Sequence, residues 1–136
     1  MAKKLYSIKE KVDSSGVPFF EYLENTLSKE VFAKLNELSN LTSVYIFSGI
    51  IRNYFLKIKE IRDIDIILED KIDVVKVFAG YDIKINSFGG YKISKGDVVI
   101  DLWYIENTWA LEFQKTLDFE LNRHIPGTAF FNFSSI

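Results

Sequence analysis

Two aspartates spaced two residues apart are the part of this sequence that best suits chemistry. Asp63 and Asp65 lie in the run Ile61–Leu68, whose alternation predicts a strand with both carboxylates on one face. Carboxylates that close together repel each other, and a bound divalent cation removes the conflict. The alternative is a solvated strand face whose aspartates keep the sheet soluble, and the Asp-Ile-Asp pattern alone does not separate the two.

A third carboxylate comes from a later run of residues. Asp101 lies in the centre of the apolar segment 97–104 and shares a strand face with Val99 and Trp103. An isolated buried aspartate is costly unless it is paired or bound to a metal. If this strand lies beside the first one, Asp63, Asp65 and Asp101 converge on a site that suits Mg²⁺ or Mn²⁺. The alternative is a structural pair between Asp101 and a buried lysine or arginine.

The composition narrows the metal chemistry further. The 136 residues include no cysteine and one histidine, His124, which we interpret as a surface or cap residue. Thiol nucleophiles, disulfides, cysteine-ligated zinc or iron–sulfur sites and multi-histidine metal sites are therefore excluded. Any metal must be held mainly by oxygen, which favours magnesium, calcium or manganese. Residues 61–136 carry eight basic against twelve acidic side chains, so we expect the metal in this half.

The elements that position these residues can be read from periodicity. Turn-rich residues 11–18 separate an N-terminal arm, 1–17, from a domain, 18–136. A helical stripe follows Pro18, with a break at Thr26–Ser28 where Ser28 caps a second helix. The remaining expected elements are a strand over 43–48 buried on both faces, a helix over 50–57, the strand 61–68, a helix over 71–79 stopped by Gly80, a hairpin of 81–86 and 91–94, the strand 97–104 and helical stretches near 107–123. This order predicts an α/β (α+β) domain with a mixed sheet.

A candidate phosphate loop precedes the aspartates. Ser48 and Gly49 come before the expected short helix, and Gly49 stands 14 positions before Asp63. A glycine lets a phosphate approach closely, and a helix N-terminus presents free N–H donors. Ser48 either caps that helix or donates to a phosphate oxygen. One glycine between a strand and a helix is common, whereas glycine followed by Asp-x-Asp and a third strand aspartate is much more specific.

These residues resemble the DNA polymerase beta-type nucleotidyltransferase superfamily, in which a strand ends in Gly-Gly or Gly-Ser before a short helix and an Asp-x-Asp strand. The head domain of CCA-adding tRNA nucleotidyltransferases and bacterial poly(A) polymerases is the most similar. Its Gly-Gly-x-Val-Arg-Asp run resembles Ser48–Asn53, and its Lys-Asp-Ile-Asp-Ile run resembles Arg62–Ile66. Its Arg-Arg-Asp-Phe-Thr-Ile-Asn-Ala run is more loosely similar to Leu121–Arg123 with Phe131–Phe133. The likeness spans roughly residues 41–136.

The sequence also departs from the head domains. Ser48 replaces the first glycine, Asn53 replaces the aspartate after Arg52, and the basic cluster is reduced to Arg123. These differences argue against CCA addition and polyadenylation as the specific activities, but nucleotidyl transfer as a reaction class is still expected. The similar enzymes continue into further helices where this chain ends, at Ile136, so we expect a fragment or a head that works with a partner.

The resemblance implies a nucleotidyltransferase fold, with a mixed, mostly antiparallel central sheet and flanking helices. It also implies a two-metal attack on the α-phosphate of a nucleoside triphosphate. Asp63 and Asp65 would bind both Mg²⁺ (or Mn²⁺) ions, and Asp101 would bind the one that activates the acceptor hydroxyl. Four residues would bind the phosphates: Ser48, Gly49, Arg52 and Arg123. The acceptor would be an RNA or tRNA 3′ end, a protein or a small molecule.

Charge and hydropathy limit the partners. The net charge is −2, so no global basic field recruits a long nucleic acid. No apolar stretch approaches the roughly 18 residues that span a bilayer, and residues 1–10 lack a signal-peptide pattern. We therefore expect a cytoplasmic protein without a membrane partner. Two other functions stay open: a non-catalytic nucleotide-binding or regulatory module, and a toxin–antitoxin component with the same fold.

Overall fold

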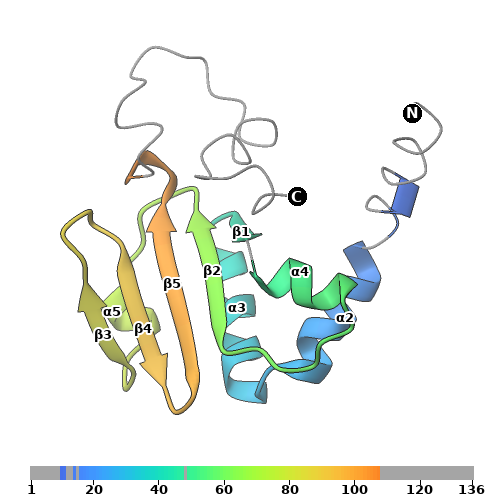
Figure 1. Ribbon diagram of the computed structural model, residues 1–136. Helices are drawn as coiled ribbons and strands as arrows, with labels where there is room; N and C mark the ends of the chain where they lie inside the picture. The colour runs from blue at the N-terminus through green and yellow to red at the C-terminus, as the bar shows by residue number, and fades with distance from the viewer. Residues whose placement is uncertain (1–9, 12–13, 15, 48, 108–136) are drawn as a thin grey trace.

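A five-stranded sheet forms the centre of the computed structural model, which describes residues 10–11, 14, 16–47 and 49–107 (Figure 1). Its strands lie in the order β1-β2-β5-β4-β3. Their bounds are β1 (Val44–Phe47), β2 (Asp63–Leu68), β3 (Asp82–Ile85), β4 (Tyr91–Lys95) and β5 (Val98–Tyr104). The helices are α2 (Gly16–Thr26), α3 (Lys29–Leu41), α4 (Gly49–Phe55) and α5 (Val74–Val77), and the 3₁₀ turn η1 (Ile105–Asn107) follows β5.

The two strands that carry the aspartates are direct neighbours. β2 and β5 run parallel, and the other three neighbouring pairs are antiparallel. The parallel register pairs Asp63 with Val99 and Asp65 with Asp101. At the start of this parallel pair, the Val99 N–H donates a hydrogen bond to the Arg62 carbonyl at 2.8 Å. The predicted α+β architecture with a mixed sheet and helices is therefore confirmed.

The break between the first two helices is also confirmed. α2 ends at Thr26, and the Ser28 hydroxyl accepts a hydrogen bond from the Val31 N–H at 3.3 Å at the start of α3. This is the N-cap geometry expected of a serine that precedes a helical stripe. α3 then buries Val31, Leu35 and Leu38 against the sheet.

Two sequence predictions need correction. The strand at 43–48 is not buried on both faces, because β1 is at the edge of the described sheet and its four residues are half-buried. The helix expected over 71–79 is reduced to α5, which Asp73 caps by accepting from the Lys76 N–H at 3.0 Å. A short apolar run does not show whether a strand lies at the edge or in the centre of a sheet. The length of a short helix is likewise decided by tertiary packing rather than by local periodicity.

The predicted hairpin of β3 and β4 is confirmed, and its turn is tightly built. The Asn86 side-chain oxygen accepts from the N–H groups of Phe88 and Gly90, both at 2.9 Å. Gly89 has a φ of +80°, which favours glycine. Gly90 lies so close to the Trp103 ring that a Cβ there would be 2.7 Å from two ring carbons. The two glycines therefore serve the turn and its packing.

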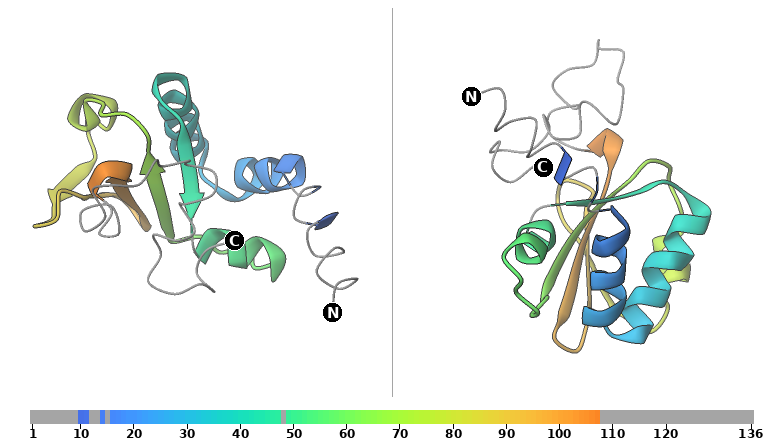
Figure 2. Two further views of the ribbon diagram at one scale, coloured as in Figure 1. Left: turned by 90° about the horizontal axis from the view of Figure 1, so that it is seen from above. Right: turned by 90° about the vertical axis from the view of Figure 1, so that its right-hand side faces the viewer.

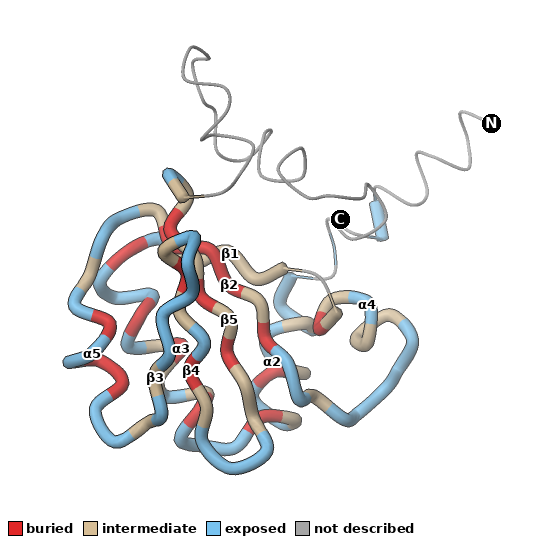
Figure 3. Tube along the Cα trace, turned by 60° about the vertical axis from the view of Figure 1, so that its left-hand side comes forward, coloured by how far each residue is buried: buried red, intermediate tan, exposed pale blue. Residues whose placement is uncertain are grey.

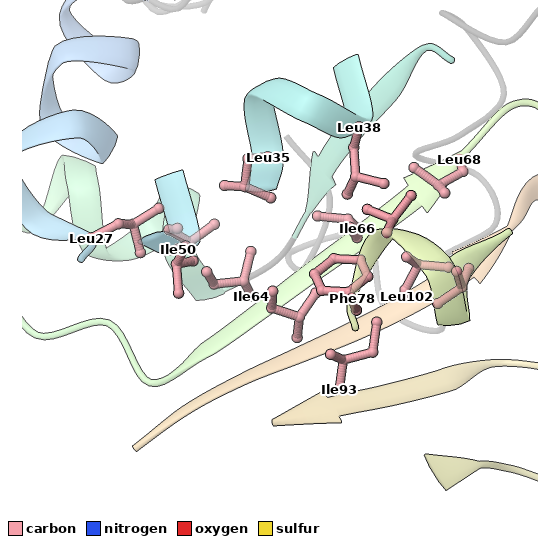
Figure 4. Close-up of a cluster of buried hydrophobic side chains, with 14 of the residues drawn as sticks. Leu27, Leu35, Leu38, Ile50, Ile64, Ile66, Leu68, Phe78, Ile93 and Leu102 are labelled. Carbon is pink, nitrogen blue, oxygen red and sulfur yellow. The ribbon is translucent and has the colours of Figure 1, made fainter. Parts of the chain in front are cut away.

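One face of the sheet is buried beneath α3 and α5 (Figures 2 and 3). Figure 4 shows fully buried Phe78, directly after α5, among Ile66, Ile93 and Leu102. α4 adds Ile50 to the same core beside the β1 edge. The alternating side chains of β2 and β5 explain this burial, because every second residue on each strand is apolar.

The opposite face of the sheet, which we call the carboxylate face, carries the intervening residues. These are Asp63, Asp65 and Ile67 on β2, Val99, Asp101 and Trp103 on β5, and Lys92 on β4. In the part of the chain that the structure describes, no helix lies over β4 and β5 on this face (Figures 1 and 2). The carboxylates therefore lie on the side of the sheet away from α3 and α5.

Some predictions fall on residues outside the described ranges. These are the helical stretches after residue 107, together with Ser48, Arg123 and His124. None of the helices within the described ranges is long and apolar enough to cross a membrane.

Candidate metal and nucleotide site

The strand register places the candidate site residues in one row across the sheet. Phe47 on β1 pairs with Asp65 on β2, which pairs with Asp101 on β5. Lys92 on β4 pairs with Asp101 from the other side, and Lys84 on β3 pairs with Lys92. Paired residues point to the same face, and neighbouring strands lie about 4.8 Å apart. An aromatic residue, two carboxylates and two ammonium groups therefore follow one another across five strands.

Asp63 lies at the start of β2, one strand period before Asp65. Two residues along a strand are separated by about 6.7 Å, so Asp63 and Asp65 share a face but are less close than cross-strand partners. Asp63 is exposed, whereas Asp65 is half-buried. Of the three aspartates, Asp65 and Asp101 are therefore the two that lie directly opposite each other, one on β2 and one on β5.

Asp101 is half-buried, with a side chain 27% exposed, rather than fully buried as its apolar strand suggests. One of its carboxylate oxygens lies 3.4 Å from the Lys92 ammonium, whose side chain is 58% exposed. The alternative of a structural pair with a lysine is therefore present in this structure, although that lysine is at the surface. Sequence reasoning missed Lys92, which was detectable only once the hairpin register was known.

The three aspartates supply the oxygen donors that Mg²⁺ or Mn²⁺ prefers, so the donor chemistry fits such an ion. Within the described residues, however, no group of three or more acidic, histidine or cysteine side chains is arranged to hold a metal ion. The register brings Asp65 and Asp101 side by side on adjacent strands, and Asp63 lies two residues from Asp65 on the same face.

Within α4, the Arg52 side chain folds back toward Gly49 at the start of the helix. A Cβ at Gly49 would lie 3.5 Å from a terminal nitrogen of the Arg52 guanidinium, so the side chain folds toward the helix start. Arg52 is exposed, which leaves its guanidinium accessible to an anion. Gly49 and Arg52 are therefore close together, as the sequence predicted for two residues three positions apart on one helix.

Asn53, on α4, supports the segment that leads into β2. Its side-chain amide donates to the backbone carbonyl of Glu60 at 3.2 Å, and its backbone carbonyl accepts from the Ile58 N–H at 2.9 Å. The Tyr22 hydroxyl donates to the Ile58 carbonyl at 2.7 Å and so connects α2 to the same segment. A carboxylate at Asn53 could not donate, so the asparagine suits this contact.

Arg62, directly before Asp63, is engaged by its own neighbour. Its guanidinium donates to one Glu60 carboxylate oxygen through two nitrogens, at 2.8 and 2.5 Å. This hydrogen bond raises the pKa of Arg62, with smaller contributions from nearby carboxylates that include Asp63. Both side chains are about two-thirds exposed or more, so the pair stabilises the fold little.

No protein-family model matches the chain, and no curated protein or solved structure matches it significantly.

Proposed function

We propose that this chain is a metal-dependent nucleotidyltransferase domain with the nucleotidyltransferase fold. The observation that carries the proposal is the register pairing of Asp65 with Asp101 on adjacent parallel strands, with Asp63 two residues away on the same face. Oxygen donors without cysteine or histidine suit the hard cations used in phosphoryl chemistry. The glycine at the start of α4 and the nearby Arg52 guanidinium support a phosphate site ahead of β2.

The roles of the residues follow from their chemistry. Asp63, Asp65 and Asp101 would hold Mg²⁺ or Mn²⁺, which when bound would lower the pKa of the acceptor hydroxyl and neutralise phosphate charge. Ser48 and the Gly49 N–H would hold the β- and γ-phosphates. Arg52 would steady that loop or the phosphates, and Arg123 is a second candidate for phosphate binding. The acceptor oxygen would form a bond to the α-phosphorus while the bond to the bridging oxygen breaks. Pyrophosphate would leave, and the hydroxyl proton would pass to solvent.

A label-transfer experiment tests this function. The full chain is incubated with Mg²⁺ or Mn²⁺, each labelled nucleoside triphosphate, and a pool of tRNA or protein acceptors. We expect transfer by the wild type and a loss of at least about 100-fold in Asp65→Asn and Asp101→Asn. Asp82→Asn is the matched control, because Asp82 lies on β3 and pairs with Lys84, 3.6 Å away. Absence of transfer by the wild type with every nucleotide, or equal transfer by all variants, would overturn the proposal.

One observation favours a second candidate, the non-catalytic nucleotide-binding or regulatory module. The ion pair between Lys92 and Asp101 gives the third carboxylate a partner that does not require a metal. In such a module, nucleotide binding would persist in Asp101→Asn and no label would be transferred. Measuring nucleotide binding beside label transfer therefore separates the two functions.

A further inference from the structure

An ion pair on the carboxylate face joins Lys92 to Asp101, one of the proposed metal ligands. Its ammonium lies 3.4 Å from Asp101, and the two residues are direct cross-strand partners on β4 and β5. The next lysine in the row, Lys84, is instead directed to Asp82 on its own strand, at 3.6 Å. The two lysines therefore have the same charge and face but different partners.

Lys92 holds its positive charge beside Asp101, one of the carboxylates that would bind the metal. Asp101 is paired in register with Asp65 on one side and with Lys92 on the other. Adjacent carboxylates need a positive charge nearby, and in this arrangement Lys92 supplies one. Its pair is weak because the lysine is more than half exposed, and its four-carbon stem lets the ammonium move away.

We propose that Lys92 competes with a divalent cation for Asp101, and that metal binding frees its ammonium to bind the phosphates of the nucleotide. This inference rests on the proposed function, because it assumes that Asp65 and Asp101 hold the metal. Lys92 then has two partners: Asp101 before the metal binds, and the triphosphate afterwards. Lys92 thus offsets one carboxylate charge before the metal binds and part of the triphosphate charge afterwards.

The first measurement is a calorimetric titration of the full chain with Mn²⁺ in the absence of nucleotide. Lys92→Met is expected to bind Mn²⁺ about two- to five-fold more tightly than the wild type, because the competing ammonium is gone. Lys84→Met is the matched control: it removes the same charge from the same face but breaks the pair with Asp82. Its smaller change measures the general effect of one positive charge at physiological ionic strength.

The second measurement is binding of a non-hydrolysable nucleoside triphosphate in saturating Mn²⁺. Lys92→Met is expected to bind it more weakly than the wild type, while Lys84→Met binds it about as well. A variant that gains affinity for the metal and loses affinity for the nucleotide is not explained by a structural role alone. Lys92→Gln repeats both tests with a polar side chain, and circular dichroism verifies that each variant is folded.

The outcomes distinguish this inference from the proposed function. If the wild type binds Mn²⁺, Asp101→Asn abolishes binding and Lys92→Met matches Lys84→Met, the competition is overturned and the metal site stands. Metal binding that appears only in Lys92→Met supports the competition most directly. If neither the wild type nor Lys92→Met binds Mn²⁺, the proposed function and this inference both fail.

Discussion

The two faces of the sheet are built from the same strands but from opposite kinds of contact. On the helix-covered face, Ile64 and Ile66 of β2 meet Ile100 and Leu102 of β5, all fully buried. On the carboxylate face, the residues in between include half-buried Asp65 and Asp101. Apolar burial gives the first face most of its stabilising energy, whereas the ion pairs of the second face are exposed, weak and screened. The fold can therefore be stable without the charges, which leaves them available for binding.

The largest effect is expected where the helix-covered face is most densely packed. Phe78 is fully buried among the aliphatic residues of β2, β4 and β5 (Figure 4). Phe78→Ala should lower the free energy of unfolding by about 3–5 kcal/mol, because it leaves a cavity as well as losing apolar burial. Urea unfolding followed by circular dichroism measures this loss.

Phe88 provides the matched control for that change. It is 71% exposed at the tip of the β3–β4 turn, so Phe88→Ala should alter the free energy of unfolding by no more than about 0.5 kcal/mol. Equal losses in the two variants would contradict the view that the helix-covered face carries the stability of the fold.

The sequence predicted the elements that depend on local alternation and missed what depends on register. The runs 61–68 and 97–104 identified both aspartate strands, because period-two alternation is a local signal. The edge position of β1 and the pair between Lys92 and Asp101 depend on which strands become neighbours and how they align. Long-range pairing decides both, and a one-residue slip would place Lys92 on the other face.

An intermediate effect is expected at Gly90, where the hairpin turn packs closely against Trp103. A methyl group at Gly90 would lie 2.7 Å from Trp103 ring carbons and 2.8 Å from the Asn86 amide nitrogen. Gly90→Ala should therefore cost about 1–3 kcal/mol of stability, as overpacked sites do. Gly16→Ala, where no atom lies within 4 Å, should be neutral or slightly stabilising.

A double variant sharpens the Gly90 prediction. If the Trp103 ring causes the clash, Trp103→Leu combined with Gly90→Ala should lose less than the sum of the two single losses. Additive losses would show that the ring is not the obstacle and that the cost comes from the turn.

A smaller effect, dependent on pH, is expected at Tyr81, which directly precedes β3. Burial, with a lesser contribution from Glu30, raises the pKa of Tyr81 from its ordinary value of 10.0 to about 12. Because the folded pKa is raised, the associated stability is complete below pH 10.0 and is lost as the pH rises through about 12.

The measurement for Tyr81 compares urea unfolding at neutral and alkaline pH. The wild type should lose stability above about pH 10, and Tyr81→Phe should lose less, because it has no hydroxyl to ionise. Part of the loss should remain, because burial also raises the pKa of Tyr22 and Tyr104. An identical pH profile for the variant would contradict the assignment to Tyr81.

Only a small effect on stability is expected at Asp101, although it is central to the proposed site. Asp101→Asn removes the ion pair with Lys92 and also one of two register-paired carboxylates, so a lost attraction and a relieved repulsion offset each other. Because Lys92 is more than half exposed, we expect the free energy of unfolding to change by less than about 1 kcal/mol in either direction, and by less in high salt. Urea unfolding at low and high ionic strength measures both the change in the free energy of unfolding and its dependence on salt.

A loss of several kcal/mol that does not respond to salt would make Asp101 a structural residue like Phe78. It would also favour the non-catalytic module, because the third carboxylate would then be explained by the fold alone.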